Sequence, residues 1–323
     1  MPPHKTERGF TLIELSIVLV IIGLIVGGVL VGQDLVRAAE VRATLSQIEK
    51  YNTAVNTFRD KYGYIPGDVT STAASQFGLL PRVGGMGLGN GDGQLEGCNA
   101  ANLGSCPSYN TTIFPFSGEQ ALFWADLSQA RLIDGAYTAI NASNDSDGFT
   151  VLQGPTTDIP QTAVGQWMPE ARLGHGNYIF VWSGGWKSGV VSGSVLGDSL
   201  NYFGLSQVAG FTNGNLMATT GTSLTVRQAY DIDLKVDDGL PQSGRAIALN
   251  AGAWAAGGGG TGAHNHAGNY NTNPNYGGPT TNATSPSTTT CYDNSGNAGT
   301  TQQYSLSQNG GANVNCALSF RFQ

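Results

Sequence analysis

A long apolar stretch near the start of the chain dominates its hydrophobic pattern. Residues 15–31 contain no charged side chain, and Leu12 and Ile13 extend the stretch on the other side of Glu14. About 20 helical residues, each rising about 1.5 Å, cover a hydrocarbon core of about 30 Å. The pattern therefore predicts a membrane-spanning helix over residues 10–32.

Beyond the apolar stretch the pattern becomes amphipathic, and charged side chains occupy the remaining faces. Gly63 and the turn Pro66-Gly67-Asp68 then end the periodicity. We expect one helix from about Phe10 to Tyr62, roughly 80 Å long, whose second half (residues 33–62) packs one stripe against a globular head. The apolar positions of that stripe are Val41, Leu45, Ile48, Val55, Phe58 and Tyr62.

The rest of the chain, residues 63–323, predicts a β-rich, loop-rich head and so an α+β fold. Ser117–Gln120 forms a capping-box pattern before a helix expected over Ala121–Leu132. Residues 252–299 are rich in Gly, Asn, Thr and Ser, which predicts a long surface loop. Short apolar runs predict strands at Tyr178–Trp182, Val190–Val195, Asn201–Leu205, Gly210–Leu216 and Arg245–Leu249, and the alternation over Cys316–Gln323 predicts a half-buried terminal strand.

Glu14 interrupts the apolar stretch. A carboxylate in the middle of a membrane-spanning helix costs about 2.5–3.5 kcal/mol on insertion scales, so such a group normally has a partner. The residues around Glu14 should therefore supply one.

The N-terminal residue order resembles that of type IV prepilins and of the pseudopilins of type II secretion systems. A leader with Lys5 and Arg8 is followed by Gly9-Phe10-Thr11-Leu12-Ile13-Glu14 and then by the apolar helix. The resemblance covers about Lys5 to Asp68 and implies a type IV pilin-like fold. It also implies that a prepilin peptidase removes residues 1–9 by cutting after Gly9 and then methylates the new amine of Phe10.

The resemblance gives Glu14 a partner as well. In that family the glutamate pairs with the terminal amine, so Glu14 would neutralise the ammonium group of Phe10 in its own or a neighbouring subunit, and each charge would offset the burial of the other. Many type IV pilins carry a proline about two-thirds of the way along the stem. This chain has Val31 near that place, which favours a pseudopilin-like or minor subunit.

Two simpler readings of the N-terminus compete with this one. A secretory signal peptide has an apolar region of about 7–15 residues before a cleavage site of small residues. The stretch here is longer, and the best small-residue candidate, Ala38-Ala39, lies inside the helical pattern. The other is a plain membrane anchor, in which the side chain of Glu14 extends from near the helix end to the membrane–water interface.

Charge and composition exclude nucleic acid as a main partner. Once Lys5, Arg8 and Glu7 are taken from the totals of 15 basic and 22 acidic residues, 13 and 21 remain, a formal net charge of −8. Charged residues make up only 11%, and the 47 glycines are about twice the usual share, which suits an extracytoplasmic, loop-rich domain. Lys5 and Arg8 place the leader in the cytoplasm and the head outside.

The four cysteines form two local sets, Cys98 with Cys106 and Cys291 with Cys316. In an oxidising compartment each set can form a disulfide, although four cysteines allow three connectivities. A metal site built from them is disfavoured, because no C-x-x-C pair or suitably spaced histidine accompanies them. Many pilins close their C-terminal region with a disulfide, so the resemblance agrees with a bridge between Cys291 and Cys316.

Two acidic segments are candidates for calcium, although no cofactor is required by the motif. Asn90, Asp92 and Glu96 lie in a stretch of alternating oxygen ligands. A twelve-residue calcium loop would begin with aspartate where this chain has Leu88, and would end with a bidentate glutamate where it has Asn99. Asn-Gly and Asp-Gly also form ordinary turns.

The second candidate is the densest acidic cluster of the chain, Asp231, Asp233, Asp237 and Asp238. By resemblance, loops of the β region in several pseudopilins bind calcium. A solvated turn is the competing interpretation. Thr225 and Gln228 can cap a helix here, yet Ile232, Leu234 and Val236 also alternate as in a strand, so the residues leave both open.

The chain shows no catalytic motif. It has no G-x-S-x-G, no H-E-x-x-H and no phosphate-binding loop. We expect a non-enzymatic subunit of the inner membrane with a periplasmic head, whose partners are the prepilin peptidase, other pilin or pseudopilin subunits and an inner-membrane assembly platform. The alternative is an anchored or secreted module that binds a sugar or surface polymer through Trp167, Trp182, Trp186 and Trp254.

Overall fold

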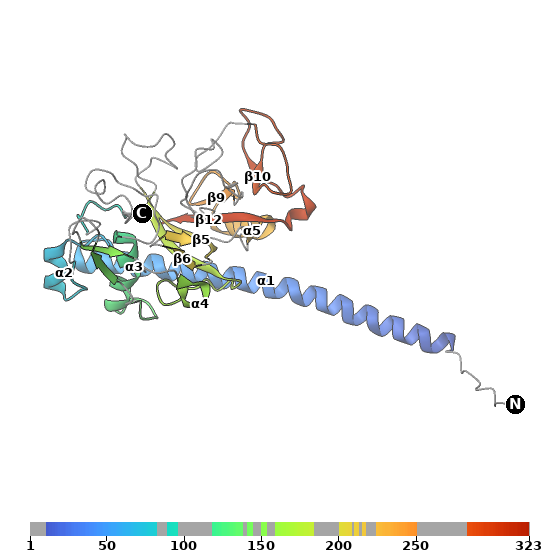
Figure 1. Cartoon of the computed structure of the whole chain (residues 1–323). Coiled ribbons are helices and arrows are strands. Elements are labelled where there is room, and N and C mark those ends of the chain that lie inside the picture. Colours follow the sequence, from blue (N-terminus) through green and yellow to red (C-terminus); the bar gives the residue numbers. More distant parts are fainter. Residues whose placement is uncertain are drawn as a thin grey trace.

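The computed structural model of the chain shows a long N-terminal helix and a head formed around its second half (Figure 1). It describes residues 11–82, 89–95, 118–137, 141–144, 150–153, 159–183, 200–208, 210–212, 215–217, 224–250 and 283–322. The expected strand Val190–Val195 lies outside these residues.

Helix α1 runs without a break over Leu12–Tyr62. It begins after the N-cap Thr11 and ends at Gly63, which takes a left-handed conformation (φ 76°) while its amide donates to the carbonyl of Arg59 at 2.8 Å. Figure 1 shows that the first half projects away from the head and that the head gathers around the second half. The single helix and the mixed α+β architecture that the sequence predicts are confirmed.

The head is organised around a five-stranded antiparallel sheet. Strand β4 pairs with β5, strands β5 and β8 pair with one edge of β12, and β9 pairs with the opposite edge of β12. The strands are β4 (Asn177–Ser183), β5 (Asn201–Gln207), β8 (Leu224–Thr225), β9 (Ala246–Asn250) and β12 (Val314–Arg321). The expected strands at residues 178–182, 201–205, 245–249 and the C-terminus are therefore present.

The terminal strand β12 is more deeply buried than its alternation predicts. It pairs with β5 and β8 along one edge and with β9 along the other, so it lies inside the sheet. Every residue from Cys316 to Phe320 is buried, including Ala317 and Ser319, which the pattern places on a solvent face. The prediction of a half-buried strand is wrong, because small side chains allow the second face to be covered. Ser319 accepts a hydrogen bond from the indole of Trp182 at 3.0 Å.

Smaller elements complete the head. Helix α3 occupies Gly118–Gln129, so it begins and ends earlier than the expected Ala121–Leu132. The expected strand at 210–216 is a pair of short strands, β6 (Gly210–Thr212) and β7 (Asn215–Met217), which join β3 (Ile159–Pro160). The others are α2 (Ser71–Phe77), α4 (Gln161–Val164), α5 (Val226–Val236), β1 (Asn141–Asn144), β2 (Thr150–Gln153), β10 (Tyr292–Asp293), β11 (Gln303–Tyr304) and the 3₁₀ turn η2 (Asn309–Gly311).

The second half of α1 contributes one stripe to the core of the head. The ring of Tyr51 lies 4.9 Å from Trp124 of α3 and 6.3 Å from Phe203 of β5, measured between centroids. The stripe is wider than the apolar positions predict, since Leu45 and Tyr62 are only partly buried while Thr44, Tyr51 and Ala54 are buried. Its buried members are Val41, Thr44, Ile48, Tyr51, Ala54, Val55 and Phe58.

A polar contact fixes the register of this stripe. The side-chain amide of Gln47 donates to the carbonyl of Glu170 and accepts from the amide of Arg172, both at 2.9 Å. Lys50 forms an ion pair with Asp134, in the segment that follows α3. These contacts tie α1 to two separate segments of the head, so the helix cannot slide along the core without breaking them.

The C-terminal segment from residue 283 is folded. Cys291 and Cys316 form a disulfide, and Tyr292 is fully buried. The composition places residues up to 299 in a surface loop, but within the described residues the segment 283–299 carries β10 and several buried side chains. The disulfide and the burial of Tyr292 attach this polar segment to the rest of the head, which its composition does not predict.

Candidate functional site: the N-terminal helix and the acidic cluster

The start of α1 is closed by a reciprocal pair of contacts between Thr11 and Glu14. The Oε2 atom of Glu14 accepts hydrogen bonds from the backbone amide and from the hydroxyl of Thr11, both at 2.8 Å. The amide of Glu14 in turn donates to Oγ1 of Thr11 at 3.3 Å. This capping box satisfies two amides that the first turn of a helix leaves without partners.

Thr11 is a residue that the sequence reasoning missed. The pattern T-x-x-E over residues 11–14 is the sequence signature of a capping box, and it was available from the printed sequence. The box turns the carboxylate of Glu14 back toward the Thr11 amide, which is the nitrogen bonded to Phe10. Gly9 and Phe10 themselves lie outside the described residues, so their assigned roles stay predictions.

The first half of α1 presents apolar side chains on every face. None of the large apolar side chains from Leu12 to Val36 is covered by another described part of the chain, and each is at least half exposed. By length and composition this is a helix that could cross a membrane. These side chains are Leu12, Ile13, Leu15, Ile17, Val18, Leu19, Val20, Ile21, Ile22, Leu24, Ile25, Val26, Val29, Leu30, Val31, Leu35 and Val36.

A comparison with known families identifies the same region. Residues 4–30 match the family model described as the prokaryotic N-terminal methylation motif. The segment is a type IV prepilin-like leader. No curated protein and no solved structure matches the chain. The identification of a prepilin-like leader therefore depends on the N-terminal segment. The arrangement of a long helix on an antiparallel sheet is consistent with a pilin-like fold.

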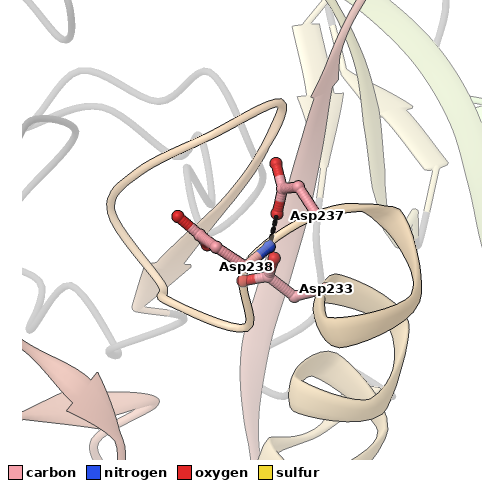
Figure 2. Close-up of side chains that lie close together, drawn as sticks. All are labelled: Asp233, Asp237 and Asp238. Atoms are coloured by element: carbon pink, nitrogen blue, oxygen red, sulfur yellow. Dashed lines mark hydrogen bonds between the residues drawn. The ribbon is translucent and has the colours of Figure 1, made fainter.

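The acidic cluster lies at the end of α5, where Asp233, Asp237 and Asp238 come together (Figure 2). Asp237 accepts from the backbone amides of Asp238 at 2.6 Å, of Ala246 at 3.1 Å and of Arg245. Asp238 accepts from the amide of Leu240 at 2.9 Å and from the hydroxyl of Ser243 at 2.7 Å. The two exposed aspartates thus hold together the turn that leads from α5 to β9.

Asp233 differs from its two neighbours because it is fully buried. Burial, followed by its hydrogen bond with Asp237, raises the pKa of Asp233 to about 8, while the hydroxyl of Tyr304, which donates to Oδ2 at 2.7 Å, opposes the rise. At neutral pH Asp233 is therefore protonated and donates to Asp237. Burial alone would raise the pKa of Asp237, but this hydrogen bond and the backbone amides hold it below the usual value.

The structure brings together three of the four aspartates named as calcium candidates. One carboxylate oxygen of each of Asp233, Asp237 and Asp238 lies within 4.8 Å of the others. Asp231 lies on another face of the helix and pairs with Arg227 at 3.2 Å. The choice between helix and strand is also settled: Thr225 and Gln228 form a capping box at the start of α5.

The other calcium candidate, around Asn90, is held by a residue that the sequence did not point to. Asp68 accepts from the amides of Gly91 at 2.6 Å and Gly93 at 2.7 Å, and its own burial raises the pKa of Asp68 to about 6. The side-chain amide of Asn90 donates to the carboxylate of Asp92 at 3.2 Å. The side chains of Asn90 and Asp92 also accept from the backbone amides of Asp92 and Gln94, both at 2.8 Å. These bonds account for the turn, and Glu96 lies outside the described residues. Calcium at this loop stays a prediction.

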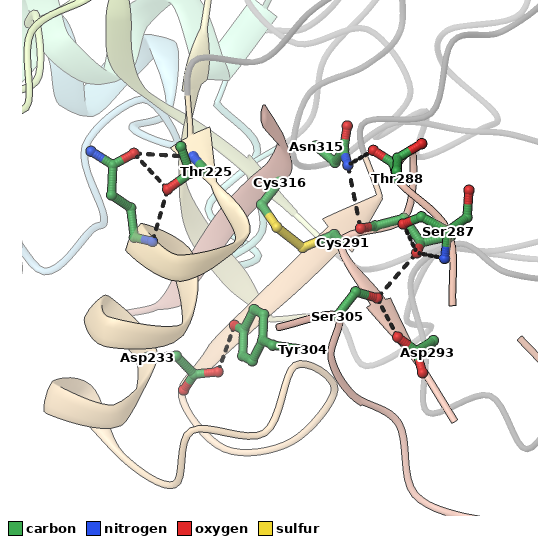
Figure 3. Close-up of a disulfide and its surroundings, with 12 residues drawn as sticks. Thr225, Asp233, Ser287, Thr288, Cys291, Asp293, Tyr304, Ser305, Asn315 and Cys316 are labelled. Carbon is green, nitrogen blue, oxygen red and sulfur yellow. Dashed lines mark hydrogen bonds between the residues drawn. A yellow bond between two sulfur atoms is a disulfide. The ribbon is translucent and has the colours of Figure 1, made fainter. Parts of the chain in front are cut away.

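The disulfide between Cys291 and Cys316 joins the C-terminal segment to the central strand β12 (Figure 3). The same view shows Tyr304 reaching Asp233, so the segment is tied to α5 as well. Cys98 and Cys106 lie outside the described residues. Trp167 and Trp182 are buried, which removes these two side chains from the alternative of an exposed aromatic binding surface; Trp186 and Trp254 lie outside the described residues.

Proposed function

We propose that the mature protein is a non-enzymatic subunit of a pilus-like or type II secretion filament, which polymerises through α1. Residues 1–9 are the leader that a prepilin peptidase removes, residues 10–32 are the membrane stem, residues 33–62 attach the stem to the head, and residues 63–323 form the head. Cleavage after Gly9 frees the amine of Phe10, which the same enzyme methylates.

The observation that carries this proposal is the uncovered apolar half of α1. About twenty consecutive residues with no partner within the described chain require a bilayer or other helices around them. A membrane satisfies this need before assembly, and the same half of neighbouring subunits satisfies it within a filament. A plain anchor would explain the first state alone and would leave Glu14 no role beyond capping its own helix.

Glu14 supplies the charge that selects the next subunit. Its Oε2 atom caps its own helix, and among the described residues no hydrogen bond involves Oε1. The side chain is therefore held in place by Thr11 while one oxygen stays able to accept from the ammonium group of a neighbouring Phe10. The partners are other pilin or pseudopilin subunits and an inner-membrane assembly platform, and the head lies in the periplasm until the subunit is extracted.

Two substitutions of Glu14 separate its charge from its capping role. Glutamine at this position also completes a capping box but carries no charge, whereas leucine removes both functions. We expect both Glu14→Gln and Glu14→Leu to insert into the membrane normally and to abolish filaments, measured by shearing and by crosslinking of neighbouring stems. Normal filaments from Glu14→Gln would show that the charge is not needed and would contradict the pairing.

We also propose that Asp233, Asp237 and Asp238 bind calcium. What supports it is that the three carboxylates converge. Binding of the ion would release the proton that Asp233 holds at neutral pH. Calcium should raise the melting temperature of the wild type and of the control variant Asp231→Asn, but not that of Asp238→Asn. A melting temperature of the wild type that does not change between calcium and a chelator would exclude the ion.

A further inference from the structure

A groove of about 1100 Å³ opens where α1 leaves the head. One wall is α1 itself from Asp34 to Val41, and the opposite wall is the exposed side of α5 with Arg227 and Lys235. Residues 310–314, which lead from η2 into β12, contribute part of the lining. The groove therefore lies on the side of the head from which the apolar half of α1 projects (Figure 1).

Its position along α1 coincides with the headgroup layer of a membrane that holds the helix. The uncharged run ends at Val31, and at about 1.5 Å per residue Asp34 and Arg37 lie roughly 5–9 Å farther along the axis. The polar layer on each side of the hydrocarbon core is about 5–8 Å thick. If the apolar run fills the core, the mouth of the groove therefore faces the phospholipid headgroups.

The groove carries an excess of positive charge in a chain whose net charge is −7. Arg37 and Asp34 lie 3.8 Å apart, and Arg227 and Asp231 lie 3.2 Å apart, so these four side chains balance each other. Lys235 also lines the groove, is exposed, and forms no ion pair among the described residues. The guanidinium group of Arg37 on one wall and the cationic groups of Arg227 and Lys235 on the other thus line a groove of about 1100 Å³.

We propose that this groove binds the headgroup of an anionic phospholipid of the membrane in which α1 is anchored. Phosphate oxygens would lie between Arg37 on one wall and Arg227 and Lys235 on the other. The head would then rest on the bilayer in one orientation before assembly. This inference relies on the proposed membrane anchoring but not on filament formation.

The test uses the full chain in nanodiscs that hold one copy each, made either of phosphatidylcholine alone or with added phosphatidylglycerol. Hydrogen exchange is measured at the amides of α5. Attraction to an anionic surface contributes about a fivefold change in binding per basic side chain. We expect exchange at α5 to slow about fivefold or more in the anionic discs, and Arg227→Gln/Lys235→Gln to abolish the difference.

The matched control is Arg59→Gln/Lys61→Gln, which removes the same charge from the C-terminal end of α1, away from the groove. In this variant the exchange of the α5 amides should still be slower in the anionic discs. Equal exchange of the wild type in both discs would overturn the proposal. So would protection that is independent of lipid and appears only in larger discs that hold two copies, since a second copy would then fill the groove. A chain that co-purifies with neither disc would refute the membrane anchoring itself, whereas normal filaments from Glu14→Gln would contradict the proposed charge pairing and leave this inference intact.

Discussion

The two halves of α1 belong to one continuous helix but differ in what surrounds them. Phe58, in the second half, is fully buried, whereas Ile21, in the first half, is 51% exposed although it is equally apolar. No cap, kink or proline separates the halves. The difference lies in the pattern of side chains: one half keeps its apolar residues to a stripe, and the other has them on all faces.

This contrast shows how the first half of the helix can change its surroundings while the second half stays fixed to the head. The second half is fixed to the head by the aromatic contacts of Tyr51 and by the hydrogen bonds of Gln47. The first half makes no such contact within the described chain, so it can exchange lipid neighbours for protein neighbours without disturbing the head. Mutations in the two halves should therefore change different properties.

The largest expected effect is on the stability of the head. Phe58→Ala removes a fully buried ring from the core, and truncations of this kind cost about 3–5 kcal/mol. We expect the free energy of unfolding of the head, measured with urea on the full chain in detergent, to fall by that amount. A loss below about 1 kcal/mol would mean that α1 is not part of the core.

A smaller effect should come from the pH dependence of the head. The pKa of Asp233 is about 8 in the folded chain against an ordinary value of 3.8, so between these limits the folded state binds a proton that the unfolded state lacks. Stability from this group is present at lower pH and is lost as the pH rises toward 8, by at most about 1.4 kcal/mol per pH unit.

Asp233→Asn tests this dependence, because an amide can donate to Asp237 and accept from Tyr304 without titrating. In buffer with a chelator, we expect the wild type to lose stability between pH 6 and pH 8 and the variant to lose less, so that the variant is the more stable protein at pH 8. Parallel curves for the two proteins would contradict the buried, protonated Asp233.

The smallest expected effect is that of Ile21→Ala. This substitution removes a similar amount of apolar surface from the first half of α1, where no described part of the head covers it. The unfolding free energy of the head should stay within about 0.5 kcal/mol of the wild type. A loss as large as that of Phe58→Ala would show that the head covers the stem, and the contrast between the halves would fail.

Local patterns in the sequence predicted most of the elements that position the site. The long helix, its amphipathic second half and strands β4, β5, β9 and β12 follow from periodicity, and Glu14 stands out because a charge is costly in an apolar stretch. The cap formed by Thr11 could have been predicted in the same way, since it depends on residues three positions apart.

Contacts between distant residues could not be predicted. Asp68 binds amides of a turn more than 20 positions away. The buried ion pair of Arg82 with Asp126, at 2.6 Å, joins the segment after α2 to α3. The alternation of Ile232 and Leu234 fitted a strand as well as a helix, and the structure buries the first and exposes the second. The burial of β12 on both faces likewise depends on strands far away in the sequence.

Processing of the leader is the central claim, and the N-terminus of the protein from membranes tests it most directly. Mass spectrometry of the N-terminal peptide should show a chain that begins at a methylated Phe10 in cells with the prepilin peptidase and at Met1 in cells without it. Met1 retained in both, or cleavage near Ala39 in both, would contradict the account.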